Sequence, residues 1–303
     1  MTGRVGVLAL SYGTPERGET EAYYTRIRHG RPPSREQLED LQRRYDAIGG
    51  TSPLAARTAA QAFGIGRVLE RRAPGRYAVE VGTKYASPSI DDGVEHLLAA
   101  GVTAIIGLVL APLSATMSTG QYHDRVVAAI GDRVAYQPIW SWFDAAGFAE
   151  LVAARVEAAC ATLNGTSPLV VFTAHSLPAR VVESGGDYAD QLAAAAASVA
   201  ARAGLGDDYL VSWQSAGRTE DEWLGPDLLD VLRTLDSSTT PNVVVCPVGF
   251  VADHLEVLYD VDVDASEVAR ARGITLVRTA SLNDDPGFME ILADLVEGTS
   301  NSS

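Results

Sequence analysis

Cysteine is scarce in this sequence, which has only Cys160 and Cys246 among its 303 residues. Two thiols cannot build the disulfide framework of a small secreted domain, and they cannot supply the four thiolate ligands of an iron–sulfur cluster. Cys246 also lies inside an apolar run, where a cysteine is most simply a small core side chain. The scarcity therefore excludes a disulfide-stabilised protein and favours a reducing, cytoplasmic setting.

Basic side chains are also in short supply. The chain has 24 Lys and Arg against 39 Asp and Glu, which gives a formal net charge of −15. That charge repels the phosphate backbone of nucleic acids and the anionic surface of membranes, but it attracts metal cations wherever carboxylates gather. We therefore expect neither nucleic acid nor a membrane as a partner, and a metal cation becomes a candidate ligand.

The sequence lacks a clear export or membrane segment. Its N-terminus has no basic region followed by a small-residue cleavage site, so it does not resemble a signal peptide. Residues 97–122 carry no Asp, Glu, Lys or Arg, but Gly101, Gly107 and Pro112 interrupt them. We predict that this stretch forms a helix end, a buried strand and a polar loop.

Eight short apolar runs alternate with helical patterns along the chain. They cover residues 5–10, 77–83, 103–111 and 134–139 in the first half, and residues 169–174, 209–214, 242–248 and 274–279 in the second. Continuously apolar strands separated by helices indicate parallel sheets that are covered on both faces. We predict an α/β fold of two similar Rossmann-like lobes, residues 1–140 and 141–303, each with a mainly parallel four-stranded sheet flanked by helices. The last helix is expected to pack back on the first lobe.

Polar residues follow the first strand of each half. Ligands of open α/β sheets bind beyond the carboxyl ends of the strands, so these positions are candidates for a site. Tyr12 follows the strand at 5–10, and His175 follows the strand at 169–174. If the halves are related, these two residues are equivalent and face each other between the lobes. His175 is then a candidate functional residue; a hydrogen-bonded structural histidine is the alternative.

An acidic segment follows the strand at 242–248. It is predicted to form a helix opened by Asp253, with carboxylates at Glu256, Asp260 and Asp264. A spacing of four residues places them on one helical face, about 6 Å apart in rise. Like charges at that spacing weaken a helix, so a route for cations or protons is one interpretation, and a solvated acidic face is the other.

Two other interpretations are weaker. No G-x-G-x-x-G follows the first strand, and the glycines Gly64 and Gly66 lie within a helical pattern, which disfavours a dinucleotide site. Ser176 is next to His175, but adjacent residues do not present their side chains to each other as a nucleophile and its base must. A serine hydrolase is therefore disfavoured.

Five motifs in this order resemble the ferrochelatase family, over about residues 5 to 290. They are Ser-Tyr-Gly-Thr-Pro at 11–15, Ile-Gly-Gly-Thr-Ser-Pro-Leu at 48–54, Phe-Thr-Ala-His-Ser-Leu-Pro at 172–178, Trp-Gln-Ser at 213–215 with Trp-Leu-Gly-Pro at 223–226, and Cys-Pro-Val-Gly-Phe at 246–250 with Asp-His-Leu-Glu at 253–256. The sequence looks most like the bacterial coproporphyrin ferrochelatases of Gram-positive and actinobacterial haem synthesis. The resemblance implies a chelatase fold with a porphyrin cleft between the lobes.

The resemblance also implies roles for particular residues. His175 and Glu256 match the metal-site pair in the second lobe, Tyr12 matches the tyrosine on the other face of the macrocycle, and Asp260 and Asp264 continue an outer acidic path. The positions that match propionate contacts are Arg28, Tyr45, Ser52 and Tyr122, with Lys84 as an addition. Which of His175 and Glu256 accepts the pyrrole protons stays open.

The expected reaction is insertion of Fe²⁺ into coproporphyrin III to give Fe-coproporphyrin III, with no resident cofactor. Some relatives carry a [2Fe–2S] cluster with cysteine ligands near the C-terminus, but this sequence has no cysteine there, so we expect none. A monomer is expected, in transient contact with the next enzyme of haem synthesis. The alternatives are a protoporphyrin IX ferrochelatase, a cobalt or nickel chelatase for a related tetrapyrrole, and a carrier that binds tetrapyrrole without metallating it.

Overall fold

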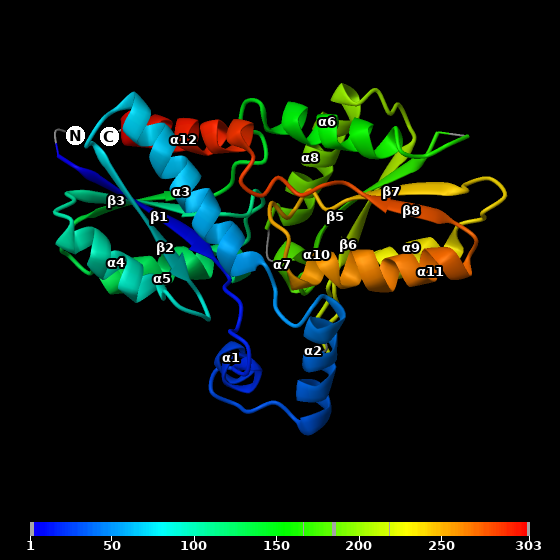
Figure 1. The fold of residues 1–303 in the computed structure, drawn as a ribbon, viewed down its shortest axis with the longest axis horizontal. Coiled ribbons are helices and arrows are strands. Elements are labelled where there is room, and N and C mark those ends of the chain that lie inside the picture. The colour runs from blue at the N-terminus through cyan, green and yellow to red at the C-terminus, as the bar shows by residue number, and fades with distance from the viewer. Residues whose placement is uncertain (1–2, 166, 184–185, 218, 302–303) are drawn as a thin grey trace.

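Two four-stranded parallel sheets form the framework of the computed structural model, which describes residues 3–165, 167–183, 186–217 and 219–301 (Figure 1). The first sheet has the order β2-β1-β3-β4 and the second β6-β5-β7-β8. Their strands are β1 (Val5–Ser11), β2 (Tyr77–Thr83), β3 (Ala104–Val109), β4 (Ala135–Ile139), β5 (Leu169–His175), β6 (Tyr209–Gln214), β7 (Asn242–Cys246) and β8 (Thr275–Arg278). The predicted fold class is confirmed, because both sheets are parallel and share one topology.

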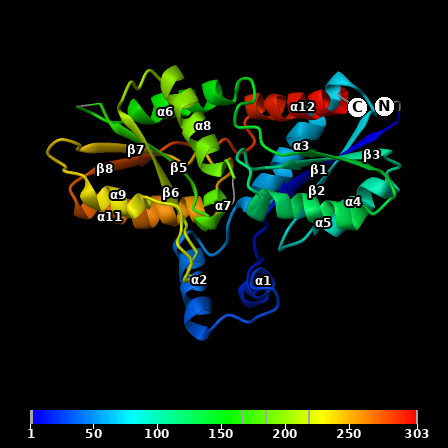
Figure 2. The same cartoon turned by 180° about the vertical axis from the view of Figure 1, so that it is seen from behind.

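Helices cover both faces of the first sheet (Figures 1 and 2). On one face lie α3 (Leu54–Arg72) and α12 (Pro286–Asn301), and on the other α4 (Ile90–Ala99) and α5 (Gln121–Ile130). Val5 and Val7 pack with α3, whereas Leu8 and Leu10 pack with α4 and α5. These residues belong to β1, which is therefore apolar on both faces because each face meets a layer of helices.

The second sheet is covered in the same way. α6 (Phe148–Cys160) and α8 (Tyr188–Arg202) cover one face, and α9 (Leu228–Thr234) and α11 (Ser266–Ala271) cover the other. Cys246 is buried in this lobe, as predicted, and burial raises the pKa of its thiol to about 12. The thiol therefore stays protonated and serves as a core side chain.

The two lobes share one apolar core that crosses between them. Trp142, just after β4, donates from Nε1 to the carbonyl of Val109 at 3.0 Å, and its ring meets Phe148 of α6 and Phe288 of α12, with centroids 5.4 and 5.7 Å away. α12 then runs back along α3, where Arg72 pairs with Asp294 at 2.6 Å. The last helix of the chain thus ties the second half of the sequence to the first lobe.

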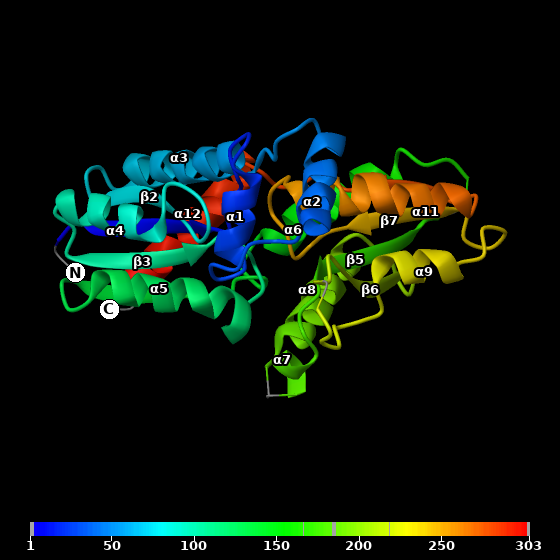
Figure 3. The same cartoon turned by 90° about the horizontal axis from the view of Figure 1, so that it is seen from below.

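Two helices stand outside the layered lobes. α1 (Thr20–Ile27) and α2 (Arg35–Ala47) project from the junction between the sheets (Figures 1 and 3). Ser34 caps α2 by accepting from the amide of Gln37, whose side chain accepts in return from the amide of Ser34. This capping box fixes the start of a helix whose far end reaches the second lobe.

The uncharged segment 97–122 folds as an element of the first lobe. It contains the end of α4, the buried strand β3 and a loop over residues 110–115, as predicted, but the loop is shorter than expected because a π-helical turn η1 (Thr116–Gly120) follows it and leads into α5. No helix within the described ranges is long and apolar enough to cross a membrane.

Phe288→Ala tests the shared core. The side chain of Phe288 is fully buried, so its removal should lower the free energy of unfolding by about 3–5 kcal/mol and destabilise both lobes in one transition, as measured by urea denaturation. Phe63→Ala is the matched control, because Phe63 is 69% exposed and its removal should change stability by less than about 0.5 kcal/mol. Two separated transitions in Phe288→Ala would contradict a shared core.

Candidate functional site

His175 and Glu256 lie side by side at the carboxyl end of the second sheet. His175 is the last residue of β5, and its Nδ1 hydrogen-bonds the carbonyl of Ser176, which leaves Nε2 facing Glu256 Oε1 at 3.5 Å. Tyr188 donates to the carbonyl of His175 at 3.0 Å and so holds the strand end in place. Both side chains remain about one-third exposed and are reachable by a ligand.

Glu256 lies between two imidazoles. Nε2 of His254 lies 3.6 Å from its Oε2, and Nδ1 of His254 is 2.8 Å from the carbonyl of Ala252. Burial opposes ionisation of Glu256, but His175 and His254 outweigh it and hold the pKa of the carboxyl well below its usual range. Burial alone would lower the pKa of His175, yet the Glu256 carboxylate raises it. The pair therefore consists of a carboxylate and an imidazole with an increased tendency to hold a proton.

The acidic segment departs from the predicted uniform helix. α10 (Leu255–Leu258) begins after His254, and Asp253 does not open it; the chain then widens into a second π-helical turn, η2 (Asp260–Ala265). The carboxylate of Asp253 is instead occupied by Ser281 and Asn283, each at 2.8 Å. The prediction of a regular α-helical row was wrong because tertiary hydrogen bonds, which sequence spacing cannot reveal, set where the helix starts.

Asp260 is the most enclosed member of this row. Ser215 donates to one of its oxygens, and Arg44 of α2 reaches the other at 3.5 Å. Burial raises the pKa of Asp260 to about 6, and the nearby Glu256 charge adds to the effect. Asp264 lies farther along η2, where its carboxylate contributes to raising the pKa of Tyr259. The three carboxylates therefore have different partners: imidazoles at Glu256, Ser215 and Arg44 at Asp260, and Tyr259 at Asp264.

Three tyrosines of the first lobe lie within the electrostatic influence of the Glu256 carboxylate. Tyr12 follows β1, is 41% exposed, and meets the ring of Tyr85 with centroids 4.9 Å apart. Partial burial raises its pKa, and the charge of Glu256 raises it further. The same two causes raise the pKa of Tyr122, and they raise that of Tyr45 to about 12, although a hydrogen bond with Thr14 lowers it. These phenols stay neutral at pH 7 and can donate hydrogen bonds.

Lys84 lies among these tyrosines. Its Nζ donates to Oε1 of Gln121 and is 5.2 Å from the ring centroids of both Tyr85 and Tyr122. Burial lowers the pKa of Lys84 to about 8, and Arg125 lowers it further. The ammonium of Lys84 therefore keeps its proton at pH 7 but loses it more readily than a free lysine does.

Arg28 and Ser52, two of the predicted propionate contacts, hydrogen-bond nearby backbone groups rather than His175 or Glu256. Arg28 follows α1 and donates to the carbonyl of Arg31 at 3.3 Å, with its guanidinium over Tyr24. Ser52 is buried before α3 and accepts from the amide of Leu54 at 3.3 Å. Neither contact reaches the His175–Glu256 pair, so the roles of Arg28 and Ser52 stay predictions.

Sequence reasoning missed three neighbours of the site. His254 contacts Glu256, Ser215 contacts Asp260, and Arg44 joins Asp260 across the lobes. The signal for His254 was present, because it is two residues before a candidate ligand. Arg44 is 216 residues from Asp260 in sequence, so no local pattern could connect them.

The structure also places the three histidines other than His175 and His254. His123 is almost fully buried, its Nδ1 is 2.5 Å from the hydroxyl of Tyr136, and burial lowers its pKa. His29 and His96 are exposed. His123 is a buried histidine of the first lobe.

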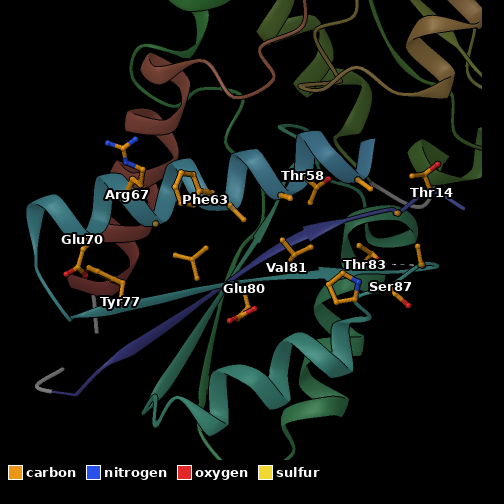
Figure 4. Close-up of a pocket in the computed structure, with 18 of the residues that line it drawn as sticks. Thr14, Thr58, Phe63, Arg67, Glu70, Tyr77, Glu80, Val81, Thr83 and Ser87 are labelled. Carbon is orange, nitrogen blue, oxygen red and sulfur yellow. Dashed lines mark hydrogen bonds between the residues drawn. The ribbon is translucent and has the colours of Figure 1, made fainter. Parts of the chain in front are cut away.

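A cavity of about 920 Å³ lies on the outer side of the first lobe, between α3 and β2 (Figure 4). Ala59, Ala62 and Val79 form part of its apolar lining, and Phe63 and Arg67 stand along α3. Neither His175 nor Glu256 lines it. Gly13 and Thr14 also line it, and Thr14 hydrogen-bonds the hydroxyl of Tyr45 at 3.4 Å, so one end of the cavity approaches the tyrosines of the first lobe.

The site offers chemistry for a divalent metal. An imidazole nitrogen and a carboxylate oxygen suit iron and other first-row metals, and the partial exposure of both leaves room for further ligands. Within the part of the chain that the structure describes, no group of three or more His, Cys, Asp or Glu side chains surrounds one metal position. His175 and Glu256 can thus supply two ligands to a metal, and its other ligands would have to come from outside this pair.

Comparisons with known proteins identify one family of relatives. Residues 4–300 match the ferrochelatase family model. The coproporphyrin III ferrochelatase of Geobacillus thermodenitrificans is 41% identical over 301 residues, covering 96% of this chain and 95% of the relative. The ferrochelatase of Herpetosiphon aurantiacus is 38% identical over 305 residues, covering 98% and 100%.

Two solved structures share the fold. CbiX, the terminal enzyme for siroheme biosynthesis in denitrifying bacteria, is 14% identical with a TM-score of 0.56, covering 97% of this chain and 98% of CbiX. SirB from Bacillus subtilis with Fe³⁺ is 13% identical with a TM-score of 0.57, covering 99% and 97%. At these identities the likeness establishes the fold alone.

Asp260→Asn tests the enclosed carboxylate. The folded-state pKa of about 6 lies above the unfolded value, so ionisation of Asp260 lowers stability as pH rises from about 4 to 6. The amide should therefore stabilise the protein by about 1–2 kcal/mol at pH 7.5 and by much less at pH 4.5, as measured by urea denaturation. An equal change at both pH values would show that Asp260 has an ordinary pKa.

Proposed function

The chain belongs to the ferrochelatase family, and we propose that it inserts Fe²⁺ into coproporphyrin III, a tetrapyrrole with four propionates. The observation that carries this proposal is the contact between His175 Nε2 and Glu256 Oε1 at 3.5 Å. The identity of 41% to a relative named for this reaction supports the choice of porphyrin.

The first demand of the reaction is a place for iron. Because Glu256 stays ionised, it supplies a negative oxygen ligand at any pH near neutrality. A proton and the metal compete for the lone pair on Nε2 of His175, since the proton that Glu256 favours must leave before Nε2 can bind iron. Arrival of Fe²⁺ at Glu256 therefore favours the neutral form of His175.

The second demand is removal of two pyrrole protons. Neutral imidazole is a suitable base near pH 7, and Nε2 of His175 is the ring nitrogen directed toward the site. Nε2 accepts one pyrrole proton at a time, and because the side chain is about one-third exposed it releases each proton to solvent before Nε2 binds iron. Tyr12, whose pKa is raised, keeps its proton and cannot act as the base at this pH. It is suited to lie against the opposite face of the macrocycle, where its hydroxyl approaches the metal axially.

The third demand is recognition of the porphyrin carboxylates. Lys84 supplies a cation, and Tyr45 and Tyr122 supply protonated phenols. Arg28 and Ser52 complete the proposed set from α1 and from the start of α3. Charge-assisted bonds from the cations offset the repulsion between a tetra-anion and a chain of net charge −15.

Iron enters this proposal as a substrate, and no resident cofactor is included. We propose that the protein works as a cytoplasmic monomer and transfers its product by transient contact with the next haem-pathway enzyme. Asp260 and Asp264 form the outer acidic path by which Fe²⁺ reaches Glu256. A carrier that never metallates its tetrapyrrole is distinguished by the absence of turnover.

Substitutions at the pair test the metal and base roles. His175→Ala and Glu256→Gln should each lower kcat for iron insertion by at least about 100-fold, because one removes the base and the other the charged ligand. Porphyrin affinity, measured by fluorescence quenching, should change by less than about threefold. Asp264→Asn is the control and should raise the KM for Fe²⁺ while leaving kcat close to the wild-type value. Near-normal turnover by His175→Ala would refute its assignment.

Substrate choice is tested by comparing two porphyrins. The wild-type protein should show a higher kcat/KM for coproporphyrin III than for protoporphyrin IX, which has two propionates. Arg28→Ala should raise the KM for coproporphyrin III about tenfold and lower kcat less, as expected when binding is lost uniformly. Equal or better use of protoporphyrin IX would overturn the substrate assignment but leave iron insertion standing.

A further inference from the structure

The shared topology of the lobes allows their strand ends to be compared one by one. β1 and β5 are the second strands in their sheets and lead to Tyr12 and His175. β2 and β6 are the edge strands beside them, and the first residues after these strands are Lys84 and Ser215. Each lobe then has a π-helical turn after its third strand, η1 in the first and η2 in the second.

In each lobe the residue after the edge strand donates a hydrogen bond to a residue at the π-helical turn. In the second lobe Ser215 donates to the carboxylate of Asp260, the first residue of η2. In the first lobe Lys84 donates to the amide oxygen of Gln121, which directly follows η1. The second lobe thus joins a hydroxyl to a carboxylate, whereas the first joins a cation to a neutral amide.

The ammonium of Lys84 is held firmly in this position. The ring centroids of Tyr85 and of Tyr122 each lie 5.2 Å from Nζ of Lys84, a distance at which an aromatic face attracts a cation. Tyr85 also contacts Tyr12, which connects Lys84 to the equivalent of His175. A second cation, Arg125, donates to the carbonyl of Lys84 at 2.9 Å and pairs with Asp91 at 2.6 Å.

The charges on the two sides of the lobe junction are therefore opposite. Glu256 and Asp260 give the second-lobe side its carboxylates, with the imidazoles of His175 and His254 beside Glu256 and Arg44 beside Asp260. On the first-lobe side the corresponding place holds the Lys84 ammonium among neutral phenols. A divalent cation is attracted to the first set and repelled by the second.

We propose that Lys84 excludes divalent cations from the first-lobe side of the site, so that iron is bound and delivered only from the side of His175 and Glu256. This inference rests on the proposed function for the identity of the metal, but the exclusion itself is a property of the unloaded protein. Gln121 takes part by keeping the ammonium in place without supplying a charge that a metal could use.

The test measures Co²⁺ binding by calorimetry at pH 7, in a background that carries His175→Ala and Glu256→Gln and therefore lacks the second-lobe pair. Gln121→Glu adds a carboxylate next to Lys84, and with the lysine intact it should tighten Co²⁺ binding by less than twofold. Adding Lys84→Met to Gln121→Glu should tighten it at least tenfold. Lys84→Arg with Gln121→Glu is the matched control and should stay within twofold of the background, because the positive charge is retained.

Each outcome decides the proposal. It is overturned if Gln121→Glu alone binds Co²⁺ as tightly as the variant that also lacks the lysine, or if the arginine control binds as tightly as the methionine variant. It is also overturned if the combined variant gains no site, because the first-lobe side would then be unsuitable for a metal whatever occupies position 84. Lys84→Gln replaces Lys84→Met if the latter unfolds, as checked by circular dichroism. Failure of the wild-type protein to metallate porphyrin would count against the proposed function and leave these affinities unaffected.

Discussion

The ionised carboxyl of Glu256 is the constraint on which the rest of the site depends. Burial raises the pKa of this carboxyl, and two imidazoles, at 3.5 and 3.6 Å, outweigh burial and hold the pKa well below its usual range. Its charge in turn raises the pKa of His175, and it adds to the effect of burial, which is the main cause of the raised pKa values of Tyr12 and Tyr122. One carboxylate therefore acts on ionisable groups in both lobes.

Several hydrogen bonds outside the pair hold this carboxylate in position. Gln214 donates to the backbone carbonyl of Glu256 at 3.1 Å and accepts from Thr173 of β5 at 2.7 Å, which ties the short helix α10 to the strand that ends in His175. On the other side, Asn283 bonds both the amide and the carboxylate of Asp253. Because α10 has only four residues, these tertiary bonds rather than helix propensity hold it in place.

The fold could be predicted from sequence more completely than the site. Continuous apolar runs such as 5–10 and 242–248 identify buried parallel strands, because only a strand covered on both faces is apolar at every position. Placement of Tyr12 and His175 at strand ends followed from that prediction. The start of α10, the π-helical turns and the contact of Arg44 with Asp260 depend on residues far apart in the chain, and no local pattern contains that information.

Two left-handed residues contact the acidic segment that contains Glu256. Among the described residues, the three non-glycine residues with left-handed backbone conformations are His29, Ser215 and Asn283, with φ of 54°, 61° and 47°. Ser215 uses that conformation to reach Asp260, and Asn283 uses it to hold Asp253. Such conformations cost of order 1–3 kcal/mol each when the residue is not glycine, and they persist where surrounding contacts determine them. For Ser215 and Asn283 those contacts are the hydrogen bonds to Asp260 and Asp253, so two of the three left-handed residues fix carboxylates of the segment that follows β7.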